Sequence, residues 1–222
     1  MTSPVEKFTY LHQSLILIVS ISISSLFSRN AYLTRNSPEL LKGTGYMSDD
    51  RLHAAADKLE IIDLSSNYMR GLDRLDGELE GSVFWEDAYL DYGVYAGGPV
   101  GFVEYCQNAL VTHASNHHFI GQVNIDLQGD EAFGEVYYQA FHRVKNEAGE
   151  DRDLFISGRY VDRYERRDGV WKIAYRSELV DWVREEAAAD AWFAGSQMIL
   201  GARKPHDPLY KRDAMNQTYT PE

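Results

Sequence analysis

The chain has 222 residues and a formal net charge of −12, a balance that argues against a nucleic-acid partner because such binding needs a basic surface. Its single cysteine, Cys106, excludes an internal disulfide and a cysteine-based zinc site. Hydrophobic residues make up 44% and charged residues 25%, the proportions of a globular domain with a substantial core.

The first 46 residues differ in character from the rest. Leu15 to Phe27 is an apolar run of thirteen residues, too short for a stable membrane span but of signal-peptide length. The residues around it offer neither a positive start nor a clear cleavage site. Met47, in contrast, opens MSDDRLHAAADKLE, whose early acidic residues favour a helix start.

We therefore expect three regions. Residues 1–46 form an extension that is disordered, mis-assigned or signal-like, residues 47–200 form the functional domain, and residues 201–222 form a C-terminal tail. A cytoplasmic location is favoured, with export as the alternative if the extension is a genuine signal.

The pattern after Met47 places helices first and strands later. Apolar residues at helical spacing predict a long helix from Asp50 to about Asp76, and their set is Leu52, Ala55, Leu59, Ile62, Met69 and Leu72. The later elements follow as a helical turn and strand (82–93), a helix (97–111), strands (119–127, 132–144, 154–167 and 170–182) and a short helix (185–199). This order predicts an α+β fold, with the helices packed on one face of a strongly curved antiparallel sheet. Such a sheet forms a cone-shaped barrel whose cavity suits a small molecule.

The stretch SNYMRGLDRL contains one residue that breaks the helical pattern. Counting 3.6 residues per turn puts Asp73 on the same face as Ile62 and Met69, where an apolar side chain is expected. In the ordinary interpretation, Asp73 ends the helix or pairs with Arg70 or Arg74. In the other, it is buried and needs a hydrogen-bonding partner.

Histidines are concentrated before the first long strand. Strand alternation puts His118, Ile120 and Gln122 on one face and His117 on the other, so one of the two adjacent histidines points inward. An inward imidazole beside a buried carboxylate is a competent general base. The ordinary interpretation of each histidine is a core or loop residue.

Metal and cofactor sites are not expected. The sequence has no HExxH motif and no paired carboxylates at ligand spacing, and it lacks the phosphate-binding motif GxGxxG. A GxSxG nucleophile elbow is also absent. We therefore predict neither a metal nor a cofactor.

Four segments together resemble a known family. They are Y-x-R-x-L-D-R at the end of the first helix, the His-His pair before a strand, AFHRV, and RYVDRYERRDGVWKIAYR. The combination is similar to the SnoaL-like branch of the nuclear transport factor 2-like superfamily, over roughly Asp49 to Trp182. That branch includes hexachlorocyclohexane dehydrochlorinase, scytalone dehydratase, bile-acid 7α-dehydratase, polyketide cyclases and diarylpropane lyases. The resemblance implies a cofactor-independent enzyme, and many members of this branch use an Asp–His pair inside the cone to move a proton.

The resemblance implies catalytic roles for three residues. The helix carboxylate of the family falls on Asp73 and its histidine on His118, with His117 as a rival. The catalytic tyrosine of the bile-acid enzyme falls on Tyr68, five residues before the aspartate.

The resemblance and the aromatic composition also suggest substrate-binding residues. His142 corresponds to a second histidine of scytalone dehydratase. The arginine of the bile-acid enzyme falls at Val180, so Arg176, on the same strand, is the substitute. Tyr92 and Trp85 are further candidates, and His117 is included as the rival histidine.

The predicted function is that of a cofactor-independent lyase acting on a bulky aromatic or cyclic apolar substrate. The reaction is dehydration or formaldehyde-releasing retro-aldol cleavage, for example of a lignin-derived diarylpropanoid. The alternative is a non-catalytic small-molecule-binding module, or a scaffold like the β-subunit of a ring-hydroxylating dioxygenase. A hydrogen bond between Asp73 and His118 would favour the enzyme. We also expect a homo-oligomer, either a dimer or a trimer.

Overall fold

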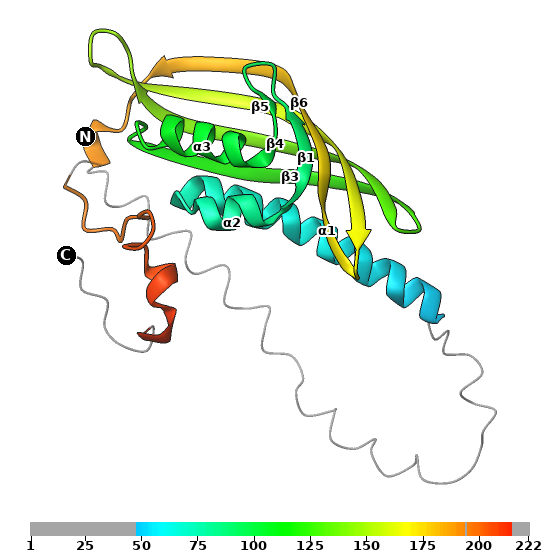
Figure 1. Ribbon diagram of the computed structural model, residues 1–222. Helices are drawn as coiled ribbons and strands as arrows, with labels where there is room; N and C mark the ends of the chain where they lie inside the picture. Colours follow the sequence, from blue (N-terminus) through cyan, green and yellow to red (C-terminus); the bar gives the residue numbers. More distant parts are fainter. Residues whose placement is uncertain (1–47, 194, 215–222) are drawn as a thin grey trace, which may run out of the picture. The chain divides into compact units, whose positions relative to one another are not determined.

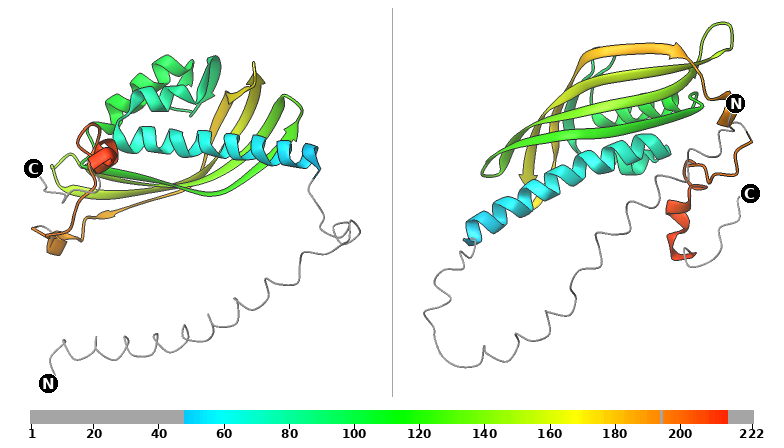
Figure 2. Two further views of the ribbon diagram at one scale, coloured as in Figure 1. Left: turned by 90° about the horizontal axis from the view of Figure 1, so that it is seen from below. Right: turned by 180° about the vertical axis from the view of Figure 1, so that it is seen from behind.

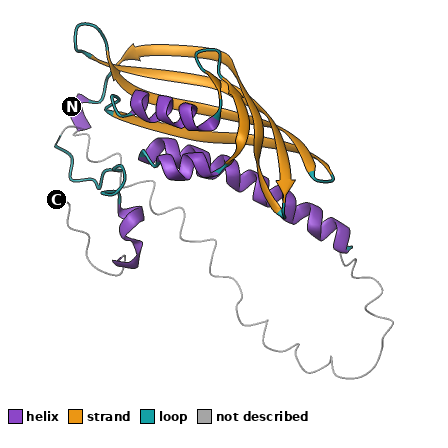
Figure 3. Cartoon of the chain, in the orientation of Figure 1, coloured by secondary structure: helices purple, strands orange, loops and turns teal. Residues whose placement is uncertain are grey.

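The computed structural model describes residues 48–193 and 195–214. Our expectation for residues 1–46 therefore lies outside the described part. Within it, helices pack against a single six-stranded sheet, as Figure 3 shows, which confirms the predicted α+β class. No described helix has the length and apolar character needed to cross a membrane.

Three helices lie on the concave side of the curved sheet (Figures 1 and 2). They are α1 (Asp49–Arg74), α2 (Gly77–Ser82) and α3 (Pro99–Leu110). Two acidic residues in the first turn of α1 favour its start, and Pro99 opens α3 at the position where a missing N–H costs least.

The sheet has the strand order β2-β1-β6-β5-β4-β3. The strands are β1 (Phe84–Asp91), β2 (Ala96–Gly97), β3 (Ser115–Gln128), β4 (Glu131–Lys145), β5 (Asp151–Arg167) and β6 (Val170–Ala187). Two details differ from expectation. β1 pairs with β6 in parallel, so the sheet is mixed, and it stays open with β3 and β2 at its edges.

Only the C-terminal half of α1 is buried. Leu52 and Leu59 are 49% and 63% exposed, so the long apolar stripe we predicted along the helix is wrong in its first three turns. The buried residues of α1 are Ile61, Ser65, Tyr68, Met69, Gly71 and Leu72. The half of the helix that carries Asp73 is therefore the half held by the core.

Close packing at Gly71 fixes where α1 ends. A Cβ atom on Gly71 would lie 2.7 Å from the backbone nitrogen of Glu80, so only glycine allows α2 to pack this closely against α1. Leu75 then adopts a left-handed conformation (φ 51°), and its N–H bonds to the carbonyls of Gly71 and Leu72. These contacts set the position of the helix end.

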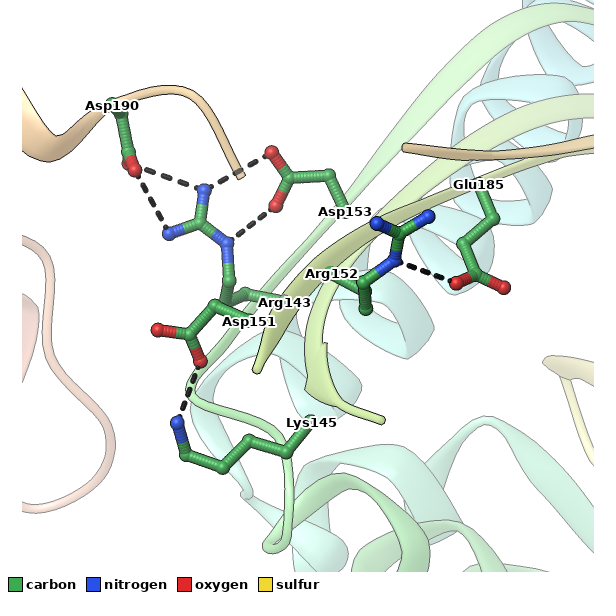
Figure 4. Close-up of polar contacts among 7 residues, drawn as sticks. All are labelled: Arg143, Lys145, Asp151, Arg152, Asp153, Glu185 and Asp190. Carbon is green, nitrogen blue, oxygen red and sulfur yellow. Dashed lines mark hydrogen bonds and ion pairs between the residues drawn. The ribbon is translucent and has the colours of Figure 1, made fainter. Parts of the chain in front are cut away.

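The last strand is longer than predicted. The expected helix over 185–199 is wrong, because β6 continues to Ala187 and only a 3-10 turn, η2 (Ala191–Phe193), follows. Arg143 of β4 holds this end, as Figure 4 shows, by pairing with Asp153 of β5 and with Asp190 beyond β6 at 3.1 Å. A second 3-10 helix, η3 (Pro208–Ala214), closes the described chain.

Candidate active site

Asp73 and His118 form the centre of the candidate site. Asp73 lies in the last turn of α1, His118 lies on β3, and the distance from His118 Nδ1 to Asp73 Oδ1 is 2.8 Å. Their side chains are only 10% and 7% exposed, so the contact is shielded from water. The two residues thus meet the geometric condition that we set for an enzyme, whereas their catalytic role stays a prediction.

Further hydrogen bonds hold the Asp73 carboxylate in place. The backbone N–H of His118 donates to Oδ1 at 3.0 Å, and the Asn116 amide donates to the same oxygen at 3.0 Å. The expected alternative of an ion pair between Asp73 and Arg70 or Arg74 is not observed, because Arg70 bonds to Asn67 and Arg74 pairs with Asp207 at 3.5 Å. The carboxylate is therefore fixed toward the sheet.

The strand face decides between the two adjacent histidines. His118 faces Asp73, whereas His117 is exposed on the opposite face of β3. A β-bulge lies between Ile120 and Val123, so Gln122 is exposed and does not share the face of His118 as we expected. Strand alternation holds for the histidines but is wrong for Gln122.

His142 lies beside His118 on the neighbouring strand β4. Their ring centroids are 5.1 Å apart, and Nδ1 of His142 is 3.2 Å from Nδ1 of His113. Burial, together with the nearby His118 and His113, lowers the pKa of His142 to about 3. His142 is therefore neutral near pH 7 and serves as a hydrogen-bonding group.

Tyr68 and Tyr92 form a buried pair of hydroxyl groups. Their oxygens are 3.0 Å apart, and Tyr68 is only 1% exposed. Burial raises the pKa of both tyrosines well above the usual value, so both stay protonated and remain donors. Phe84, Phe102 and Tyr160 surround the Tyr68 ring.

Arg176 packs against this group of aromatic rings and is fully buried. It donates to both oxygens of Asp162, at 2.8 and 2.7 Å, and its guanidinium lies over the rings of Tyr68 and Tyr160. Its Nη1 has no hydrogen-bond partner within the described residues. Arg176 thus places a cation against the rings of Tyr68 and Tyr160.

Trp85 does not join the other candidates. Its indole N–H donates to the carbonyl of Glu165, and Arg167 and Lys172 lie over its ring. These contacts place it beside the β5–β6 hairpin. The predicted substrate contact of Trp85 therefore has no support from this geometry.

Three polar residues at the site were missed. Asn116 is buried on β3, and its amide oxygen accepts a hydrogen bond from Arg203 at 2.9 Å. Glu178 on β6 accepts a hydrogen bond from Tyr138 at 2.7 Å. Strand alternation could have found Glu178, because it lies two residues after Arg176 and shares its face. No sequence signal marks Arg203.

A depression of about 390 Å³ between α1 and β3 gives access to the Asp73–His118 pair. Its lining residues are Ser66, Met69, Arg70, Asp73, Arg74, His118, Phe119, Ile120 and Leu209. In the part of the chain that the structure covers, no group of three or more histidine, cysteine or acidic side chains is arranged to hold a metal ion.

Comparison with known families agrees with this architecture. The family model described as a SnoaL-like domain matches residues 53–177, which is more than half of the chain. The chain belongs to the SnoaL-like domain family. The matched residues run from the first turns of α1 to the middle of β6, and the SnoaL-like domain therefore includes Asp73, His118 and Arg176.

Named relatives of this SnoaL-like chain are dehydrochlorinases. Hexachlorocyclohexane dehydrochlorinase 1 of Sphingobium indicum is 33% identical over 140 residues, which are 58% of this chain and 82% of that protein. The gamma-hexachlorocyclohexane dehydrochlorinase of the same species is 31% identical over 148 residues, 61% of this chain and 86% of that protein.

Solved structures show the same fold. A hexachlorocyclohexane dehydrochlorinase of Novosphingobium barchaimii aligns with a TM-score of 0.57 at 22% identity, covering 63% of this chain and 96% of its own. A candidate scytalone dehydratase of Novosphingobium aromaticivorans aligns with a TM-score of 0.54 at 21% identity, covering 64% and 94%. At these identities the likeness concerns the fold alone.

Proposed function

We propose that this SnoaL-like protein is a cofactor-independent lyase that acts on a bulky aromatic or cyclic apolar substrate. His118 removes a proton from the substrate, and Asp73 holds the imidazole in the tautomer whose Nε2 is free to accept it. The reaction is dehydration or formaldehyde-releasing retro-aldol cleavage, for example of a lignin-derived diarylpropanoid. Both reactions begin with removal of one proton, from carbon or from a hydroxyl group.

The single observation that carries this proposal is the contact from His118 Nδ1 to Asp73 Oδ1 at 2.8 Å. Three donors converge on the carboxylate, whereas Nε2 of His118 makes no hydrogen bond to any residue that the structure describes. A non-catalytic scaffold has no need of this arrangement. The names of the dehydrochlorinase relatives agree with a lyase, since removal of hydrogen chloride also begins with loss of a proton.

Tyr68 and Tyr92 act as hydrogen-bond donors in the proposed reaction. Both hydroxyls stay protonated because burial raises their pKa values, so they stabilise negative charge that develops on a substrate oxygen. Arg176, beneath the Tyr68 ring, adds a favourable positive potential. His117, on the other face of β3, takes no part.

The test compares three variants on one panel of compounds. The purified protein, without added cofactors, is offered phenolic diarylpropanoids, hydroxysteroids and halogenated rings, and the products are measured by mass spectrometry. We expect His118→Ala and Asp73→Asn each to lower kcat by about 100-fold or more, because each removes the positioned base.

His117→Ala is the matched control. It removes the adjacent imidazole from the exposed face of β3 and should leave kcat within about twofold of the unchanged protein, the effect of a surface substitution. Circular dichroism and thermal melting check that all three variants fold. Undiminished turnover in folded His118→Ala or Asp73→Asn protein would contradict the proposal.

A further inference from the structure

The register of the sheet places His118 and Glu178 on one face. Cross-strand neighbours point to the same side of a sheet, and two rows contain these residues. Across β3, β4, β5 and β6, the first row of paired residues is His118, Ala140, Ile156 and Val183. The second row is Val123, Val136, Tyr160 and Glu178, and one further row on the same face lies between the two. Both rows face α1, because His118 contacts Asp73 and the Tyr160 ring packs against Tyr68. The imidazole of His118 on β3 and the carboxyl group of Glu178 on β6 thus lie on the same, concave face of the sheet, at opposite ends of these two rows.

The surface of the sheet between His118 and Glu178 is mostly apolar. The intervening row is Ile120, Tyr138, Gly158 and Val180. Val180 and Val183 are 51% and 56% exposed, so the helices leave the β6 side of this surface uncovered. An apolar ring that lies here would have His118 at one end and Glu178 at the other.

The Glu178 carboxyl group is partly buried and contacts the Tyr138 hydroxyl. One of its oxygens accepts a hydrogen bond from the Tyr138 hydroxyl at 2.7 Å. Gly158 makes this contact possible, since its missing Cβ would lie 3.0 Å from the Tyr138 hydroxyl. Burial raises the pKa of the Glu178 carboxyl, while the Tyr138 hydrogen bond and the charges of Arg176 and His118 oppose the shift. Tyr92, Tyr160 and Cys106 also lie near Glu178, and burial raises the pKa of each, which keeps them neutral.

We propose that Glu178 is the general acid that works opposite His118, and that the leaving group of the substrate is therefore a hydroxyl group. Chloride leaves without protonation, whereas hydroxide is a poor leaving group and needs a proton as the bond breaks. This inference rests on the proposed function and selects dehydration from the reactions it allows.

The proposed elimination moves two protons and releases one water molecule. His118 Nε2 takes a proton from carbon, the electron pair of that C–H bond forms a C=C bond, and the adjacent C–O bond breaks. The Glu178 carboxyl gives its proton to the departing oxygen, which leaves as water. His118 then releases its proton to solvent, and Glu178 takes one up, so the net change is loss of one water molecule.

The test uses two compounds that differ only in the leaving group, an aryl β-hydroxyketone and the matching β-chloroketone. Formation of the shared enone product is followed by its absorbance. We expect Glu178→Gln to lower kcat for the hydroxyketone by about 100-fold or more and to leave the rate with the chloroketone within about threefold. Glutamine keeps the size of the side chain and the oxygen that accepts from Tyr138, so the fold should persist.

Asp181→Asn is the matched control, because Asp181 lies on the same strand, is 44% exposed and pairs with Arg159. It should change neither rate. Equal loss on both compounds, or no loss on either, would overturn the role of Glu178 while leaving the lyase proposal standing. If His118→Ala keeps both activities, or the unchanged protein acts on neither compound, the proposed function itself fails.

Discussion

Glu80 has a buried carboxyl group that the proposed chemistry does not use. It is fully buried, Gln107 donates to one of its oxygens at 2.6 Å, and the other oxygen has no hydrogen-bond partner in the described part of the chain. Burial raises its pKa from 4.5 to about 7, against the opposing effect of the Gln107 hydrogen bond. Its position is imposed by the close packing of α2 on Gly71.

The raised pKa of Glu80 makes stability depend on pH. In the unfolded chain this carboxyl ionises near pH 4.5, whereas in the folded protein it holds its proton until about pH 7. The stabilising contribution of the protonated Glu80 carboxyl to the free energy of unfolding is therefore fully present below pH 4.5. It is lost as the pH rises through about 7. Above pH 7 the folded state bears the cost of a buried charge.

We expect Glu80→Gln to stabilise the protein at pH 8, by about 2–3 kcal/mol, because glutamine has no charge to bury. The gain should disappear near pH 4. Urea unfolding at both pH values measures the difference. Glu86→Gln, at an exposed position, is the control and should show no such pH dependence. A gain for Glu80→Gln of equal size at both pH values would contradict this explanation.

At the scale of elements, the C-terminal segment holds the two helix ends nearest the site. Nη2 of Arg203 donates to the carbonyls of Leu110 and His113 and to Asn116 Oδ1, each at 2.9 Å. A cation is favourable at the C-terminal end of α3. In addition, the backbone N–H of Lys204 donates to the Arg74 carbonyl at 2.8 Å.

These contacts connect the segment to the catalytic pair through Asn116, which donates to Asp73. The family match ends at residue 177, so this support comes from a region outside the matched domain. Asp76 reinforces it by accepting hydrogen bonds from Lys204 and Tyr210. The predicted tail, residues 201–222, is therefore packed against the domain as far as the structure describes it.

We expect Arg203→Ala to lower the free energy of unfolding by about 1.5–3 kcal/mol, because three partly buried acceptors lose a charged donor. We also expect a lower kcat with little change in KM, since Asn116 would no longer be held against Asp73. Thermal melting and steady-state kinetics measure the two effects. The control Arg212→Ala, at an exposed position of η3, should change neither. Unchanged stability in Arg203→Ala protein would show that the segment is not an anchor.

At the scale of the whole molecule, we propose that the chain from Met47 onward is a complete folding unit. The hydrogen bonds and ion pairs described for the candidate site join residues between Asn67 and Asp207. We expect a protein that begins at Met47 to keep the melting temperature and turnover of the full chain. Removal of residues 201–222 is the contrasting deletion and should lower both, because it removes Arg203. Loss of folding in the chain that begins at Met47 would contradict the proposal.

Local sequence patterns predicted the class of fold and the centre of the site. The apolar spacing around Met69 and Leu72, the Asp168–Gly169 turn and the alternation of β4 each depend on neighbouring residues, so they can be seen in the sequence. Helical spacing likewise singled out Asp73, whereas strand alternation left His117 and His118 as alternatives and the family resemblance favoured His118. The role of Asp73 and His118 stays a prediction.

The tertiary structure decided what depends on residues far apart in the chain. The bulge after Ile120 turns Gln122 outward, and the parallel pairing of β1 with β6 changes the sheet from antiparallel to mixed. Arg203 reaches Asn116 across 87 positions, and Glu178 joins the face of His118 only through the register of four strands. Spacing along the chain carries no information about such contacts, because they are set by how the sheet curves and how the helices and the C-terminal segment pack against it.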